Sequence, residues 1–228
     1  MQYAPMWLLD ALRPTPSPLV AQGTRTVCEM LRTSGEMFDA ATATALDNAP
    51  LTVDLGAMDE TVNAGEREVR RHLLEHLAVS PQDDLSWSLL LLTTIQDAER
   101  CGDLAKSIAK AAGLADAPRE GPHAETLRQL RDRVRPVFAH TCEAVTSGDA
   151  DAARQVMLTN DELKGAMADL LGAIAHDGAL TPNAATVLTL TTRMIGRVAS
   201  HLSNIASAVA LPFDLVRSGP EAQAAPSA

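Results

Sequence analysis

Apolar residues recur along most of the chain at spacings of three and four residues, which place them on one face of a helix. This periodicity predicts six helices, at residues 18–47, 54–79, 84–113, 124–147, 150–176 and 181–211. No segment alternates apolar and polar residues with a period of two, so strands are not expected. Pro136 lies inside the fourth helix and is expected to kink it or to split it near Arg135. The pattern therefore predicts an all-α protein.

Proline-rich and polar stretches separate these helices into two groups of three. We predict an apolar and proline-rich N-terminal segment, two three-helix bundles joined by a linker, and a disordered tail. Their boundaries are expected at residues 1–17, 18–115, 116–123, 124–217 and 218–228. The N-terminal segment contains Trp7, Leu8 and Leu9, which would dock either on the bundle or on a partner.

The third helix carries the most informative pattern in the chain. One of its stripes, with steps of 4, 3, 4, 3 and 4 residues, changes from leucine to polar side chains: Leu85, Leu89, Leu92, Gln96, Glu99 and Asp103. The other faces of this helix are apolar or small, so we expect it to lie inside a bundle. A carboxylate buried there needs a partner, because an unpaired buried charge is costly.

Two kinds of partner for Glu99 and Asp103 are consistent with this stripe. The first is a salt bridge with an arginine such as Arg67, Arg70 or Arg100. The second is a metal ion shared with carboxylates of a neighbouring helix, because hard oxygen ligands suit Mg²⁺, Ca²⁺, Mn²⁺ or non-haem iron. The spacing alone favours the salt bridge, since this pairing is common on helices.

The two groups of helices also align as an internal repeat. Glu99 aligns with Gly196 and Asp103 aligns with Ser200. The second copy therefore lacks the carboxylate pair of the first copy.

Several stretches resemble the PhoU family of helical regulators of phosphate uptake. The main one is DAERCGDLAKSIAK, which contains the family motif as Asp97, Glu99, Arg100, Gly102 and Asp103. The stretch MDETVNAGEREVRRHLLEHLAVSPQDDLS before it and the stretch GRVASHLSNIASAVALPFDLVR near the C-terminus are also similar to the family. Together they extend the resemblance over about residues 18–217. The resemblance implies the same architecture of two three-helix bundles.

The resemblance implies metal binding in the first half only. Glu99 and Asp103 are the expected ligands, and Asp97 is a weaker candidate. Asp59 matches an acidic position on the preceding helix of the family and would complete the site, with Asp161 as its counterpart in the second half. The expected ion is iron, manganese, magnesium or zinc.

Composition narrows the remaining classes of function. The net charge of −10 argues against binding to nucleic acid or to an anionic membrane surface. The longest strongly apolar run, residues 87–92, is far shorter than the span of about 20 residues that crosses a membrane. No signal peptide is evident, and 3 scattered cysteines predict neither a disulfide framework nor a zinc site, which fits a reduced cytoplasm.

No arrangement typical of catalysis is found. A Glu-x-x-His pair, which a ferritin-like di-iron bundle needs on two helices, occurs only at Glu120 and His123 in the linker. The sequence has no glycine-rich phosphate loop and no nucleophile elbow. We therefore expect a protein that is not an enzyme.

The PhoU resemblance implies an adaptor that acts by protein–protein contact. The expected partners are a membrane phosphate transporter and a phosphate-sensing histidine kinase, with the chain as a cytoplasmic homodimer held at the inner face of the plasma membrane through its partner. The transporter would be a sodium–phosphate cotransporter or an ABC-type phosphate importer, and the ending SNIASAVALPFDLVR favours the cotransporter. The alternatives are a metal-storing or redox bundle and a helical scaffold unrelated to phosphate.

Overall fold

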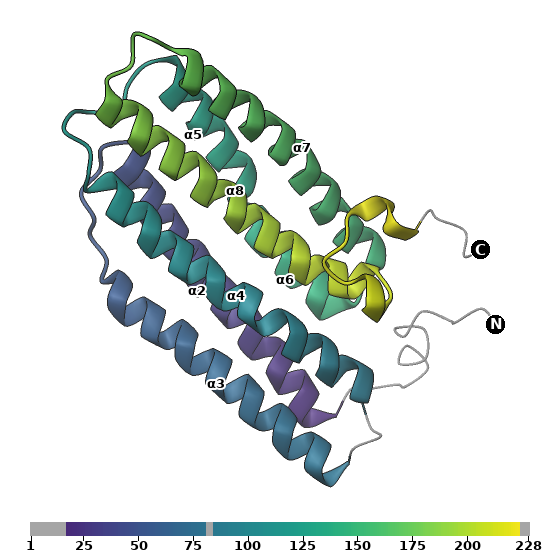
Figure 1. Cartoon of the computed structure of the whole chain (residues 1–228). Coiled ribbons are helices and arrows are strands. Elements are labelled where there is room, and N and C mark those ends of the chain that lie inside the picture. The colour runs from purple at the N-terminus through teal and green to yellow at the C-terminus, as the bar shows by residue number, and fades with distance from the viewer. Residues whose placement is uncertain (1–16, 81–83, 224–228) are drawn as a thin grey trace.

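The computed structural model of the chain describes residues 17–80 and 84–223, and in this part every regular element is a helix (Figure 1). The elements are α2 (Pro18–Leu46), α3 (Leu55–Val79), α4 (Leu85–Ala112), α5 (Pro122–Val134), α6 (Val137–Ser147), α7 (Ala150–His176), α8 (Pro182–Ala210), and the short 3₁₀ helices η1 (Phe213–Leu215) and η2 (Pro220–Gln223). The predicted all-α fold is confirmed.

The helix ends follow from local chemistry. The Asp54 side chain accepts hydrogen bonds from the first backbone N–H groups of α3, and Thr181 caps α8 just before a proline at the first helical position. Pro136 separates α5 from α6, so the fourth predicted helix is split next to Arg135. A proline cannot donate the backbone hydrogen bond that a continuous helix needs there.

Helix α4 lies at the centre of the bundle. It packs against α2 and α3 on one side and against α8 on the other, while α7 covers α8. Figure 1 shows α3 and α7 at opposite edges of the molecule, with α4 and α8 side by side between them. One hydrophobic cluster contains side chains from α2 through α8, and the rings of Phe38 and Phe138 meet within it at 5.6 Å between centroids. The two groups of helices therefore share a core.

Polar contacts also join the two groups. Arg128 and Arg131 on α5 pair with Asp47 after α2, and Arg135 pairs with Asp39 on α2. These pairs are partly exposed, so each is expected to add at most about 1 kcal/mol to stability. They fix the position of α5 and α6 against α2.

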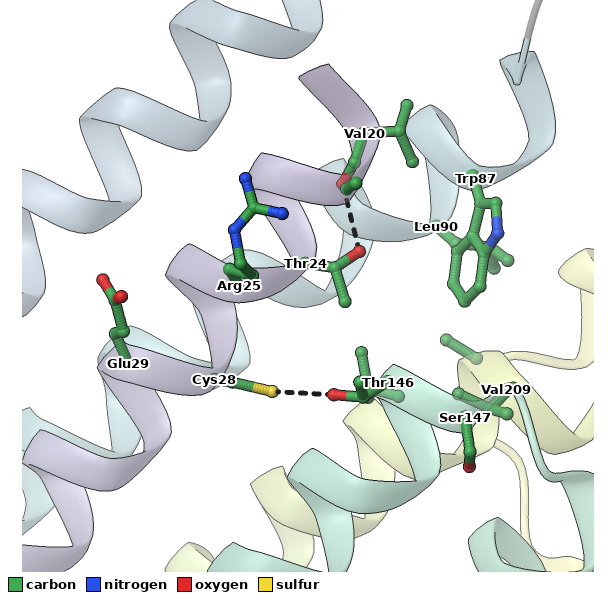
Figure 2. A pocket seen from close by; sticks show the side chains of 14 residues that line it. Val20, Thr24, Arg25, Cys28, Glu29, Trp87, Leu90, Thr146, Ser147 and Val209 are labelled. Carbon is green, nitrogen blue, oxygen red and sulfur yellow. Dashed lines mark hydrogen bonds between the residues drawn. The ribbon is translucent and has the colours of Figure 1, made fainter. Parts of the chain in front are cut away.

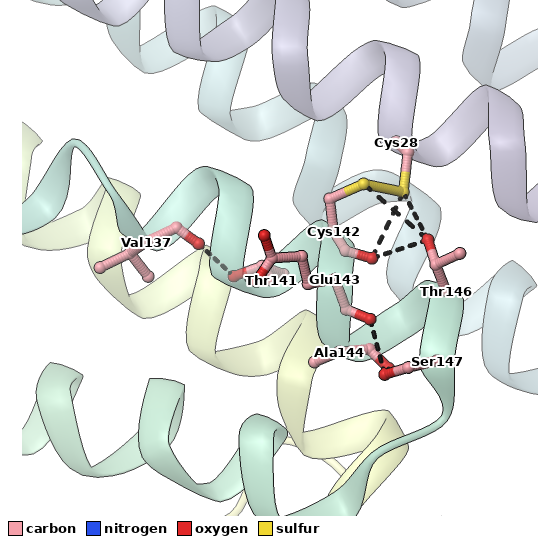
Figure 3. Close-up of a disulfide and its surroundings, with 8 residues drawn as sticks. All are labelled: Cys28, Val137, Thr141, Cys142, Glu143, Ala144, Thr146 and Ser147. Atoms are coloured by element: carbon pink, nitrogen blue, oxygen red, sulfur yellow. Dashed lines mark hydrogen bonds between the residues drawn. A yellow bond between two sulfur atoms is a disulfide. The ribbon is translucent and has the colours of Figure 1, made fainter.

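A disulfide between Cys28 on α2 and Cys142 on α6 links the groups covalently (Figure 3). The expectation that the cysteines form no disulfide is therefore wrong for these two. They are 114 residues apart in the sequence, and only the packing of α2 against α6 brings their Cα atoms to 5.2 Å. The third cysteine, Cys101, is free and buried, and burial raises the pKa of its thiol.

The structure describes little of the two predicted terminal segments. Residues 1–16 of the predicted N-terminal segment lie outside the described residues. A disordered tail was expected over residues 218–228, but Pro220–Gln223 form η2 beside α7, and residues 224–228 lie outside the described part. Among the described residues, no helix is long and apolar enough to cross a membrane.

Candidate functional site

Four carboxylates gather between α3 and α4. Asp59 and Glu66 come from α3, and Glu99 and Asp103 come from α4. We refer to these four residues as the carboxylate cluster. Asp59 is 8% exposed, so the cluster reaches into the protein interior.

A lysine lies within this cluster and supplies its nearest positive charge. The Nζ atom of Lys106 is 2.6 Å from Oδ2 of Asp59 and 2.9 Å from Oδ1 of Asp103. Arg100 donates to the other oxygen of Asp103 at 2.9 Å and approaches Glu99 at 3.7 Å. The other two arginines proposed as partners, Arg67 and Arg70, pair instead with Glu60 and Glu66. Lys106 and Arg100 each lie three residues from Asp103, which places all three side chains on one face of α4.

Glu99 and Asp103 share a hydrogen bond, and their titration is affected in opposite directions. Burial and the neighbouring Asp103 carboxylate raise the pKa of Glu99 to about 7, and Glu66 adds to this effect. Burial alone would also raise the pKa of Asp103, but Lys106 holds it below its usual value. Near neutral pH, the Glu99–Asp103 pair therefore holds a proton, and Glu99 is the carboxyl group that carries it.

One oxygen of the cluster has no hydrogen-bond partner. Oδ2 of Asp59 accepts from Asn63 at 3.1 Å and pairs with Lys106, but Oδ1 is buried and unsatisfied. A Cβ atom at Gly102 would lie 3.7 Å from this Oδ1, in ordinary van der Waals contact. The α3–α4 interface therefore contains a buried carboxylate oxygen without a hydrogen-bond partner, next to Gly102.

The cluster, as placed, does not fit a metal ion. Carboxylate oxygens are suitable ligands, and the unsatisfied Asp59 oxygen is available. However, the Lys106 ammonium occupies the position between Asp59 and Asp103 where a cation would bind. Within residues 17–80 and 84–223, no group of three or more aspartate, glutamate, histidine or cysteine side chains is arranged to hold a metal. Metal binding at Glu99, Asp103 and Asp59 stays a prediction that requires Lys106 to move.

Asp97, the fourth predicted ligand, lies on a different face of α4. Its Oδ1 is 2.7 Å from Nδ1 of His201 and accepts from Asn204 at 3.0 Å, and its Oδ2 accepts from Arg217 at 2.8 Å. Burial would raise the pKa of Asp97, but these three partners hold it below its usual value. Asp97 therefore ties α4 to α8 and to the segment after α8, away from the carboxylate cluster.

The equivalent face of the second half contains no carboxylate. Gly196 and Ser200 on α8 pack against Met167 and Asn160 on α7, with the Ser200 hydroxyl 3.5 Å from the Asn160 oxygen. Asp161 was predicted as the counterpart of Asp59, but it is exposed and pairs with Lys164. The buried Asn160 occupies that position instead, because the helix turns the neighbouring residue toward solvent.

A second hollow of the described surface lies elsewhere, at the end of the bundle where α2 and α4 begin. This cavity has a volume of about 730 Å³, and we call it the apolar groove. Its lining side chains come from α2, α4, α6 and α8. Val20, Thr24, Trp87, Leu90 and Val209 are among those labelled in Figure 2. Arg25 and Glu29 lie on its rim, and Cys28 of the disulfide borders it.

Sequence reasoning missed one member of the carboxylate cluster, Glu66, and the lysine beside it, Lys106. Lys106 lies on the same face of α4 as Asp103, so its spacing of three residues was available as a signal. Glu66 lies seven residues after Asp59, which also places both on one face of α3. The partners of Asp97 gave no such signal, because Arg217 is 120 residues away in the sequence.

Comparison with known proteins connects this geometry to a family. A family model of the PhoU domain matches residues 27–112, which include the whole carboxylate cluster. No curated protein matches the chain. Two solved structures have a similar fold. The phosphate transport system regulatory protein PhoU from Streptococcus pneumoniae has a TM-score of 0.75 at 18% identity, over 83% of this chain and 92% of that one.

The second solved structure, PhoU from Pseudomonas aeruginosa, has a TM-score of 0.67 at 19% identity, over 88% of this chain and 94% of that one. At these identities the structures establish the fold alone, and the family model establishes the domain. The resemblance predicted from the sequence is thus confirmed: the chain carries a PhoU domain in its first half and has the PhoU fold over most of its length.

Proposed function

We propose that this chain regulates phosphate uptake by contact with a membrane phosphate transporter. The observation that carries this proposal is the PhoU domain match over residues 27–112, within a chain whose fold is that of two PhoU proteins. One of those proteins is described as the regulator of a phosphate transport system. A long helical bundle offers extended surfaces for protein contact, which suits an adaptor.

The finer parts of the proposal concern its partners. The chain would form a homodimer and contact either a sodium–phosphate cotransporter or an ABC-type phosphate importer, and a sensor histidine kinase would be a second partner. The ending of the chain and the loss of carboxylates from the second half favour the cotransporter. Binding at the inner face of the membrane would then occur through the transporter.

Deletion of the gene tests the regulatory role. In phosphate-replete medium, we expect phosphate uptake and alkaline phosphatase expression to rise in the deletion strain and to return to normal when the wild-type gene is restored. Unchanged uptake and unchanged phosphatase expression would instead support a helical scaffold unrelated to phosphate.

Affinity purification from phosphate-replete membranes tests the choice of partner. We expect the tagged chain to recover a cotransporter. Recovery of ABC-importer subunits alone would overturn that choice but leave the regulatory role intact.

A further inference from the structure

The apolar groove has a volume suited to several side chains, but the described residues leave it open. Its walls come from the first turns of α2 and α4 and from the last turns of α6 and α8. Trp87 and Leu90 on α4 face Val20 and Thr24 on α2 across the open space (Figure 2). An apolar hollow of this size is a favourable place to bury hydrophobic side chains.

We propose that the groove binds the N-terminal segment of the same chain, residues 5–12, with Trp7, Leu8 and Leu9 as the buried anchors. The sequence of this segment, PMWLLDAL, is the most apolar stretch outside the described residues. A tryptophan can bury about 150–250 Å² of surface, so it is an effective anchor for such a groove.

The position where the described chain begins supports this assignment. The backbone N–H of Ser17 donates to Oδ2 of Asp84 at 2.8 Å, which fixes the start of the described chain beside the first turn of α4. Trp87, three residues after Asp84, lines the groove. Ser17, to which the N-terminal segment is joined, therefore lies at the edge of the groove.

The length of the segment also suffices. Leu9 is eight residues before Ser17, and an extended chain spans at most about 3.3–3.6 Å per residue, so it reaches about 26–29 Å. The groove extends along α2 from Val20 to Cys28, which is about 12 Å at 1.5 Å per residue. A tether this short keeps the segment at an effective concentration of roughly millimolar near the groove, so weak contacts are enough for binding.

Charge at the rim is complementary as well. Arg25 is exposed and forms no ion pair with any described residue, although it lies one turn from Glu29. The segment carries Asp10 directly after its apolar anchors. A contact between Asp10 and Arg25 would set the direction in which the segment lies.

The chain offers a direct probe, because Trp7 and Trp87 are its 2 tryptophans. In a Trp87→Phe protein, Trp7 alone reports fluorescence. We expect its emission to be shifted to shorter wavelength, and its quenching by acrylamide to be several-fold weaker, than in a free peptide of residues 1–16. In a Trp7→Phe protein, deletion of residues 1–16 should increase the quenching of Trp87.

A matched pair of variants locates the binding site. Thr24 and Thr44 both lie half-buried on α2, and each hydroxyl donates to the carbonyl four residues earlier at 3.1 Å. Only Thr24 lines the groove. In the Trp87→Phe background, Thr24→Glu should return Trp7 to the behaviour of the free peptide, and Thr44→Glu should leave it unchanged. Leu8→Asp/Leu9→Asp should release the segment without altering the bundle.

Three outcomes would overturn the proposal. Trp7 as exposed as in the peptide would mean that the segment does not dock. Protection that survives Thr24→Glu, in a protein whose circular dichroism shows it folded, would place the segment elsewhere. Protection that disappears on dilution, together with dimers in light scattering, would assign the groove to a second copy of the chain.

Discussion

The two halves of the molecule share an architecture but differ in chemistry at equivalent interfaces. Between α3 and α4, four positions are acidic, and between α7 and α8 the matching positions are uncharged. The pairs are Asp59 and Asn160, Glu66 and Met167, Glu99 and Gly196, and Asp103 and Ser200. The structure supports this matching, because Ser200 contacts Asn160 and Gly196 faces Met167.

This difference shows that the fold does not require charge at the interface. The second half packs its helices with a methionine against a glycine and with a hydroxyl near an amide. The position of Lys106 is also uncharged in the second half, where Ser203 matches it. The lysine at this position is thus present only in the half that has the carboxylates, whereas Arg100 is matched by Arg197 in the other half. We infer that Lys106 neutralises the cluster, and that the cluster serves a purpose other than packing.

Replacement of Lys106 should have the largest effect on the stability of the first-half interface. Lys106→Met leaves the buried Asp59 without its cation, which we expect to lower the free energy of unfolding by about 2–3 kcal/mol in metal-free buffer. Added Mn²⁺ or Mg²⁺ should restore part of this stability by binding the freed carboxylates. Chemical denaturation and elemental mass spectrometry measure the two effects.

Lys110→Met is the matched control, because Lys110 lies one turn later on α4, is exposed and forms no ion pair with a described residue. It should change neither stability nor metal content appreciably. If the purified wild-type protein contains a metal that the Glu99→Ala/Asp103→Ala variant lacks, then Lys106 is not the resident cation. The predicted metal site would then be correct.

Local signals predicted much of the fold and part of this site. Helix ends at Asp54, Thr181 and Gly148 were predictable, because a cap or a glycine with positive φ acts on adjacent residues. Contacts between distant segments were not predictable. Cys28 and Cys142 are separated by 114 residues, and their pairing depends on how α2 crosses α6, which periodicity does not specify.

The cation that balances the carboxylate cluster was likewise not predictable from the sequence. The stripe on α4 predicted that Glu99 and Asp103 need a partner, and it left open whether that partner is an ion or a side chain. The answer depends on side-chain placement between α3 and α4, where Lys106 reaches Asp59 across the interface. The spacing of residues in the sequence places Lys106 on the right face of α4, but it does not give the distance from Lys106 to Asp59.

Gly196→Ala tests whether the second-half interface is packed too closely for a larger side chain. A Cβ atom there would lie 2.7 Å from Sδ of Met167, which is buried and would have to shift. We expect a loss of up to about 1 kcal/mol, despite the better helix propensity of alanine. Gly172→Ala on α7 is the control, since nothing lies within 4 Å of its added Cβ, and it should gain about 0.5–1 kcal/mol. Equal effects in thermal unfolding would contradict close packing at Gly196.

Glu99→Gln should give the smallest effect and the clearest dependence on pH. The folded-state pKa of Glu99 is about 7, above its ordinary value of 4.5, so the folded protein holds this proton more tightly than the unfolded chain. The stabilisation is complete below about pH 4.5 and is lost as the pH rises through about 7. Glutamine imitates the protonated state at every pH.

The variant should therefore match the wild type near pH 5 and exceed its stability near pH 8 by on the order of 1 kcal/mol, less than full linkage because Asp103 shares the proton. Glu75→Gln, at an exposed position on α3, controls for the loss of one negative charge from an acidic protein. Denaturation curves at both pH values measure the difference. A wild type more stable than Glu99→Gln at pH 8 would mean that a cation stabilises ionised Glu99 more strongly than the 3.7 Å approach of Arg100 indicates.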